Sequence, residues 1–154
     1  MAGADTVTTT SIRAAQPGQA FRTTMTVLRL LFGLHFLVNG ANFFFPFFSI
    51  APPHSPMALM VMHALVTSGL FNFAKTTEVV VGVALLSNRF VPLALVLAFP
   101  VACIIAYVDV VLIGTLFGGW VLGGGTLLLN AALLLGYLRY YRPMLTMRSA
   151  PDLA

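Results

Sequence analysis

The chain has 154 residues, of which 59% are hydrophobic and only 8% are charged, with a formal net charge of +4. An ordinary soluble domain carries about 25% charged residues, so the composition excludes one and predicts a protein of the lipid bilayer. The length suffices for four helical spans of about 20 residues each. Because membrane topology by itself produces a basic excess, we expect no nucleic-acid partner.

The first predicted elements are a tail and a membrane span. Residues 1–24 lack the apolar core of a signal peptide, so we expect a disordered cytoplasmic tail. The first span is predicted at residues 25–46, where polar residues are isolated within apolar sequence. The segment 51–56 (APPHSP) contains three prolines and cannot continue a helix. We therefore expect the chain to turn there.

The apolar stretch that follows, residues 57–88, is too long for one span. A helix of this length would measure roughly 46 Å, well beyond the hydrocarbon thickness of a bilayer. Ser55 and Pro56 indicate a helix start, and Ser68 and Gly69 offer a break. The prediction is a short interfacial helix at 57–67 and a second span at 69–87. A single, strongly tilted helix is the alternative.

Two further spans complete the predicted fold. The third is expected at 91–113, and a connection rich in glycine (Gly114, Gly118, Gly119) leads to the fourth at 120–141. Residues 144–154 are expected to form a cytoplasmic tail. The fold class is therefore all-α, an integral membrane four-helix bundle formed by one domain over residues 25–143.

The cations predict the orientation of the bundle. All seven arginines lie in the two tails, near the ends of spans one and four, or in the turn between spans two and three: Arg13, Arg22, Arg29, Arg89, Arg139, Arg142 and Arg148. The other two connections contain no Lys or Arg. The positive-inside rule therefore predicts that both termini face the cytoplasm, and we expect a multi-pass protein of the inner (cytoplasmic) membrane of the cell.

Polar side chains near the middle of the bilayer are the candidates for function. Counting 1.5 Å per residue from the arginines places Asn39 at about 15 Å, Glu78 at about 16 Å and Asn130 at about 13 Å. Lys75 lies three residues before Glu78, close enough for an ion pair across one helical turn. Two interpretations of these polar residues are open. They form a binding site for a proton or for a polar headgroup, or Lys75 and Glu78 form a self-neutralising structural pair with the asparagines as partners.

Other polar residues have more specific expectations. His35, at about 9 Å, is positioned to bind a quinone headgroup or relay a proton, although a lone histidine is more often a bundle residue with satisfied hydrogen bonds. Asp109 falls near the outer boundary at about 30 Å, where we expect it to be hydrated. A polar stripe in span two is predicted to face the bundle: Ser68, Asn72, Lys75, Glu78 and Gly82.

Metal and thiol chemistry find little support in the sequence. No cluster of His, Cys or carboxylate residues has the spacing of metal ligands, and haem ligation would leave His35 as the sole axial candidate. Cys103 is the one cysteine, which excludes an intrachain disulfide and a CxxC relay. We expect no metal and no cofactor held by the chain itself.

Three segments together resemble the DoxX-like family of small four-span membrane proteins. They are RLLFGLHFLVNG at 29–40, SG at 68–69 with KTTEVVVG at 75–82, and NRFVPLAL at 88–95. The resemblance covers about residues 27–143, and the spacing of Lys75, Glu78 and Gly82 before a basic turn is its most specific element. It implies a four-span fold and a redox setting, and it marks Lys75 and Glu78 as functional candidates.

The expected function is that of an accessory or quinone-facing subunit in a membrane redox system, with a protein partner and without catalysis by the chain alone. The expected pocket consists of Glu78 neutralised by Lys75, with Asn39, Asn130 and His35 nearby. The alternatives are a small proton-coupled transporter that uses Glu78 and a non-catalytic assembly factor or cargo receptor. The glycines would also permit a homo-oligomer.

Overall fold

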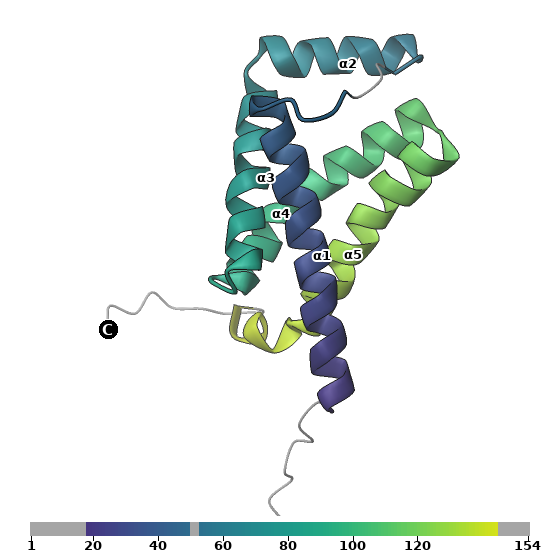
Figure 1. The fold of residues 1–154 in the computed structure, drawn as a ribbon. Coiled ribbons are helices and arrows are strands. Elements are labelled where there is room, and N and C mark those ends of the chain that lie inside the picture. Colours follow the sequence, from purple (N-terminus) through teal and green to yellow (C-terminus); the bar gives the residue numbers. More distant parts are fainter. Residues whose placement is uncertain (1–17, 50–52, 145–154) are drawn as a thin grey trace, which may run out of the picture.

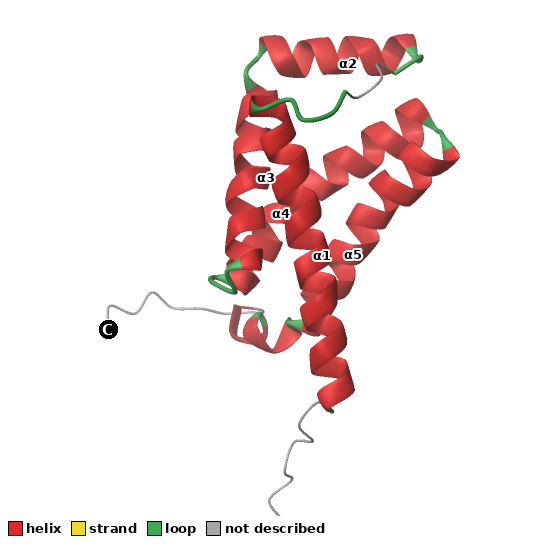
Figure 2. Ribbon diagram, viewed as in Figure 1, coloured by secondary structure: helices red, strands yellow, loops and turns green. Residues whose placement is uncertain are grey.

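The computed structural model describes residues 18–49 and 53–144, which form an all-α fold without strands (Figures 1 and 2). The α-helices are α1 (Gln19–Phe44), α2 (Pro56–Thr67), α3 (Leu70–Leu86), α4 (Val91–Ala106) and α5 (Gly125–Gly136). Two π-helical stretches, η1 (Tyr107–Ile113) and η2 (Leu116–Gly124), extend α4 and precede α5. Short 3-10 turns follow at η3 (Leu138–Tyr140) and η4 (Arg142–Met144).

Three helical segments in this part of the chain are long and apolar enough to cross a membrane. They are α1, the continuous helix Val91–Ile113, and the continuous helix Leu116–Gly136. With 17 residues, α3 alone is shorter than these three segments. Together with α2, from which it is separated by a bend of 82°, it gives a candidate fourth crossing. The all-α class and the membrane-spanning character of these helices therefore agree with the sequence analysis.

The first helix begins earlier than predicted. It starts at Gln19 rather than at residue 25, so the last part of the expected tail is helical. The hydroxyl groups of Thr23 and Thr26 donate to the carbonyls four residues before them, which lets these polar residues continue the helix without a partner elsewhere. Residues 1–17 of the predicted tail and the tail at 145–154 lie outside the described residues.

The break between α2 and α3 lies where the sequence predicts it. Ser55 caps α2 by accepting from the Ala58 N–H at 3.4 Å, and Pro56 occupies the first turn. Gly69 has a φ of +77°, a left-handed conformation that a residue with a Cβ rarely adopts. In Figure 1, α2 lies across the end of α3 rather than in line with it. The alternative of one continuous tilted helix is therefore wrong.

The glycine-rich connection is mostly helical, which corrects the prediction of a loop. Gly114, with a φ of +69°, and Thr115 make the turn, and η2 begins at Leu116. A Cβ on Gly119 would lie 2.6 Å from the backbone oxygen of Asp109. The glycines therefore allow the backbones of η1 and η2 to pack closely against each other. In the sequence, glycines in such a helix contact cannot be distinguished from glycines in a loop.

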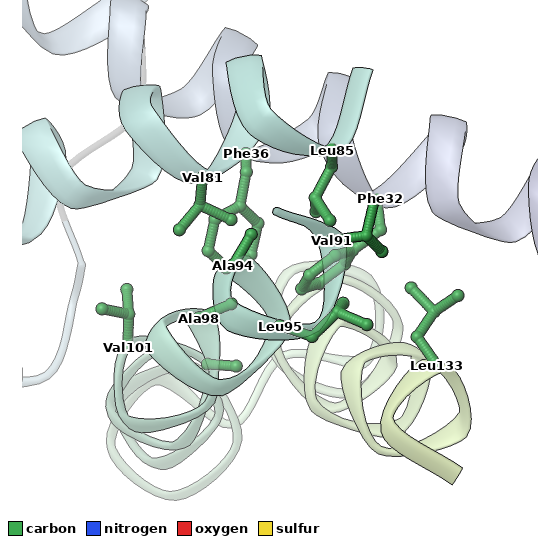
Figure 3. Close-up of a cluster of buried hydrophobic side chains, with 11 residues drawn as sticks. Phe32, Phe36, Val81, Leu85, Val91, Ala94, Leu95, Ala98, Val101 and Leu133 are labelled. Carbon is green, nitrogen blue, oxygen red and sulfur yellow. The ribbon is translucent and has the colours of Figure 1, made fainter. Parts of the chain in front are cut away.

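The apolar core lies where α1, α3, α4 and α5 meet. Phe32 and Phe36 of α1 are in ring contact, with centroids 4.5 Å apart, and they are fully or almost fully buried. Figure 3 shows their neighbours in the cluster: Val81, Leu85, Val91, Ala94, Leu95, Ala98, Val101 and Leu133. This cluster fixes α1 against its neighbours and so positions the polar side chains one turn further along α1.

The outer surface of the helices is apolar as well. Each long helix exposes large hydrophobic side chains, for example Leu31, Val80, Leu97 and Leu128. In water such a surface would be unfavourable over so large an area, whereas lipid tails are a suitable solvent for it. The exterior therefore indicates contact with a bilayer.

The arginines of the described residues and two hydrogen bonds between segments lie at one end of the fold. In Figure 1 the start of α1, the turn between α3 and α4, and the end of α5 lie at this same end. Arg29 of α1 donates to the side chain of Asn88 in that turn. The Tyr141 hydroxyl donates to the Pro92 carbonyl of α4 at 2.9 Å. These contacts hold the arginine-bearing ends of all four segments together.

Candidate functional site

Lys75 and Glu78 form the ion pair that their spacing predicts. The Lys75 Nζ lies 2.8 Å from each carboxylate oxygen of Glu78, and Glu78 is only 1% exposed. The ring of Phe71, one turn before Lys75, lies with its centroid 5.3 Å from the ammonium nitrogen. The ammonium group therefore already satisfies both oxygens of the buried carboxylate.

Close packing of α1 on α3 covers this pair. A Cβ on Gly40 would lie 2.9 Å from both the Glu78 Cβ and the Lys75 carbonyl oxygen, and a Cβ on Gly82 would lie 2.6 Å from the Leu37 nitrogen. Such distances leave no room for a side chain, so both positions require glycine for this helix contact.

The polar stripe predicted for span two faces the bundle only in part. Glu78 and Gly82 are buried and Lys75 is partly buried, whereas Asn72 is exposed. Ser68 is also exposed and is not part of α3, since it forms the end of α2. The prediction is therefore wrong for these last two residues: the break at Gly69 separates Ser68 from α3, and Asn72, in the first turn of α3, is exposed.

A second polar group links α1 to α5 through His35. The His35 Nε2 lies 3.0 Å from the Thr126 hydroxyl, and the His35 Nδ1 lies 3.2 Å from the amide nitrogen of Asn39. Asn39 also donates to the His35 carbonyl at 2.9 Å, and Thr126 donates to the Leu122 carbonyl at 2.6 Å. His35 is thus held from both sides of its ring, and α1 and α5 lie side by side at this point (Figure 1).

An apolar groove of about 300 Å³ has His35 and Thr126 in its wall. The remaining lining residues come from α1 and from the helix formed by η2 and α5: Leu31, Phe32, Val121, Leu122, Gly125 and Leu129. Leu31 and Val121 are about half exposed on the apolar outer surface, so the groove opens where lipid tails would lie. Its volume is at the lower end of the range for small-molecule sites.

Asn130, a member of the predicted pocket, has a different neighbour. Its side chain is fully buried and its amide nitrogen lies 3.3 Å from the Leu95 carbonyl of α4. Its carbonyl oxygen Oδ1 has no hydrogen-bond partner among the described residues. This contact joins α5 to α4, whereas the Lys75–Glu78 pair lies between α1 and α3.

Asp109 lies where η1 packs against η2. It is half-buried, and a Cβ on Gly123 would clash with the Asp109 Cβ, so glycine is needed for this close approach. The expectation that this carboxylate is hydrated stays a prediction.

The structure thus divides the predicted pocket into separate contacts. Lys75 is bonded to Glu78, Asn39 to His35, and Asn130 to α4. Thr126, which the sequence analysis did not name as a site residue, is the partner of His35 in the groove wall. Its position four residues before Asn130, on the same face of the helix, was the signal that could have identified it.

Among the residues at 18–49 and 53–144, no three His, Cys, Asp or Glu side chains come together in a way that could hold a metal ion. Cys103 is a partly buried free thiol.

Comparison with family models, with curated proteins and with solved structures gives no match to this chain. The resemblance to the DoxX-like family therefore depends on the motif residues alone and stays a prediction.

Proposed function

We propose that the protein is an accessory, quinone-facing subunit of a membrane redox system and that the groove at His35 and Thr126 is its binding site. The observation that carries this proposal is the placement of two hydrogen-bonding side chains in the wall of an apolar groove that opens on the lipid-facing surface. A lipophilic quinone needs both parts, a polar contact for its headgroup and an apolar path for its tail.

The Lys75–Glu78 pair has a supporting role in this proposal. Both carboxylate oxygens are bonded to Lys75, and Gly40 closes α1 over them. A ligand headgroup would have to displace an ion pair in a low-dielectric interior, which is costly. The same pairing gives no specific support to a transporter that exchanges protons at Glu78. We therefore shift the proposed site from Glu78 to His35.

The proposed membrane topology has four crossings with α2 in the plane of the outer interface. The 82° bend at Gly69 turns α2 across the bundle when α3 runs along the membrane normal. The described arginines near the helix ends are all at the opposite end of the fold, which supports cytoplasmic termini in the inner membrane. Reporter fusions at residue 50 and at the carboxyl terminus test this, and the same side for both would contradict it.

The binding test uses the full chain, purified in mild detergent, and a benzoquinone with a ten-carbon tail as the probe. Trp120, the single tryptophan, adjoins the groove residue Val121, so its fluorescence should be quenched on binding. We expect saturable quenching that His35→Leu weakens at least tenfold and that His63→Leu, on the exposed face of α2, leaves unchanged. Equal quenching in wild type and His35→Leu would refute the proposed site.

A protein partner is the other half of the proposal. Affinity purification from native membrane under mild detergent should recover a redox protein together with extracted quinone. Recovery of the chain alone, without a partner or a lipophilic small molecule, would remove the basis for a subunit of a redox system.

A further inference from the structure

Arg29 carries a buried charge that has no counter-ion among the described residues. It is 7% exposed, its Nη1 donates to the side-chain oxygen of Asn88, and its buried Nε has no hydrogen-bond partner in this part of the chain. An amide oxygen is a neutral acceptor, so it leaves the positive charge uncompensated. A buried charge without an opposite charge is unfavourable, which makes this guanidinium a candidate binding group for an anion.

No carboxylate lies near this guanidinium within residues 18–49 and 53–144. The acidic residues of that part are Glu78, which is bonded to Lys75, and Asp109, which lies where η1 packs against η2. The start of α1, the turn between α3 and α4, and the segment after α5 lie at one end of the fold (Figure 1). These segments carry four more arginines, all of them exposed: Arg22, Arg89, Arg139 and Arg142. The described part of this end therefore holds five arginines and no carboxylate.

The surroundings of the Arg29 guanidinium are those of a membrane boundary. Asn88 is exposed, so its bond to Nη1 marks the side from which an anion can reach the guanidinium. The helix that carries this charge also exposes an apolar strip beside it: Val27, Leu30 and Leu34. An anion that binds here meets apolar surface as well as positive charge. A phospholipid matches both, with its phosphate group and its acyl chains.

We propose that Arg29 binds the phosphate group of an anionic phospholipid in the cytoplasmic leaflet, in place of the Asn88 amide oxygen. Arginine binds phosphate oxygens through charge-assisted hydrogen bonds, which are stronger than a bond to a neutral amide. The exposed arginines nearby favour a lipid with net negative charge over a zwitterionic lipid, which brings a cation of its own. The proposal shares only the membrane topology with the proposed function, and the quinone groove plays no part in it.

Two variants distinguish a lipid site from an arginine with a purely structural role. Arg29→Gln removes the uncompensated charge, so we expect a midpoint of thermal unfolding within about 2 °C of wild type without lipid, and no gain from anionic lipid. Asn88→Asp has nearly the same shape and places a carboxylate against the guanidinium. Aspartate also tolerates the left-handed backbone at this position, where φ is +57°. We expect Asn88→Asp to be more stable than wild type without lipid and to lose most of the lipid response, because the chain then contains the counter-ion.

The experiment follows thermal unfolding of the full chain in a neutral detergent by circular dichroism, with dioleoyl phosphatidylglycerol or dioleoyl phosphatidylcholine added in equal amounts. We expect phosphatidylglycerol to raise the wild-type midpoint by at least about 3 °C more than phosphatidylcholine does, and to give less than about 1 °C of difference in either variant. Arg89→Gln, which removes the exposed cation next to Asn88, is the matched control and should keep most of the wild-type response.

Equal lipid responses in wild type and Arg29→Gln would overturn the proposal, because the attraction would then come from the exposed arginines. The same Arg29-dependent rise with inorganic phosphate alone would assign a soluble anion and overturn the lipid as the ligand. A response that appears only when Asp5 and Asp152 are both replaced by asparagine would overturn it as well, since the chain itself would supply the counter-ion. Quinone binding at His35 is measured separately, so none of these outcomes decides the proposed function.

Discussion

The Lys75–Glu78 ion pair permits a sharp test of how buried charge is held in this fold. Lys75→Met leaves a carboxylate that is 1% exposed without its partner, and Glu78→Leu leaves an unpaired ammonium group. Breaking a buried pair from one side costs about 3–5 kcal/mol, because the remaining charge stays away from water. The Lys75 side chain is 16% exposed and flexible, so we expect Glu78→Leu to fall at the lower end of this range.

The double variant should behave differently from the sum of the two single variants. Replacing both charges with apolar residues of similar volume is often neutral or stabilising, so we expect its unfolding free energy to lie within about 1 kcal/mol of wild type. The assay is unfolding by SDS in mixed micelles, followed by circular dichroism. Arg139→Met, which removes an exposed cation, is the control and should change stability by less than about 0.5 kcal/mol.

The outcome that refutes this reasoning is additivity. If the double variant loses as much stability as the two single variants together, the charges interact with other groups rather than mainly with each other. The same double variant also distinguishes the two candidate sites, since binding at His35 should survive in it. Loss of quinone binding in a folded double variant would return the ligand site to Glu78.

Three further substitutions, one of them a control, test the helix contacts with the same unfolding assay. Gly82→Ala should lower stability by about 1–3 kcal/mol, because the new Cβ meets the Leu37 backbone at 2.6–2.8 Å, whereas Gly125→Ala has open space and should be neutral or slightly stabilising. Equal effects of the two alanines would mean that α1 and α3 are not in close contact. Asn130→Leu should stay within about 1 kcal/mol of wild type, since it removes a 3.3 Å hydrogen bond together with an unpartnered buried oxygen. A loss above about 3 kcal/mol would show that Oδ1 has an essential partner.

Local chemistry made several elements predictable from the sequence. The Ser55 cap and the left-handed Gly69 delimit α2, and both depend on residues within a few positions of each other. The Lys75–Glu78 pair is equally local, since three residues on a helix suffice to bring the charges together. In each case the sequence contains both partners of the interaction in one short segment.

The groove was not predictable in the same way. His35 and Thr126 are 91 residues apart, and a count of 1.5 Å per residue would place Thr126 about 20 Å from Arg139 but His35 about 9 Å from Arg29. The count fails because Arg139 lies in a 3-10 turn beyond the end of α5. Depth along one helix is therefore a poor guide to contacts between helices.

The distribution of charge explains why a neutral site fits this bundle better than a charged one. Lys75 and Glu78 neutralise each other, and the close packing of α1 on α3 leaves a ligand no room to replace either. His35 and Thr126 carry hydrogen-bonding capacity without a formal charge, so they can face an apolar groove at little desolvation cost. A quinone carbonyl is likewise neutral and accepts hydrogen bonds. The search for a ligand is thus better guided by where uncharged polar side chains meet the lipid-facing surface than by where the sequence places its few charges.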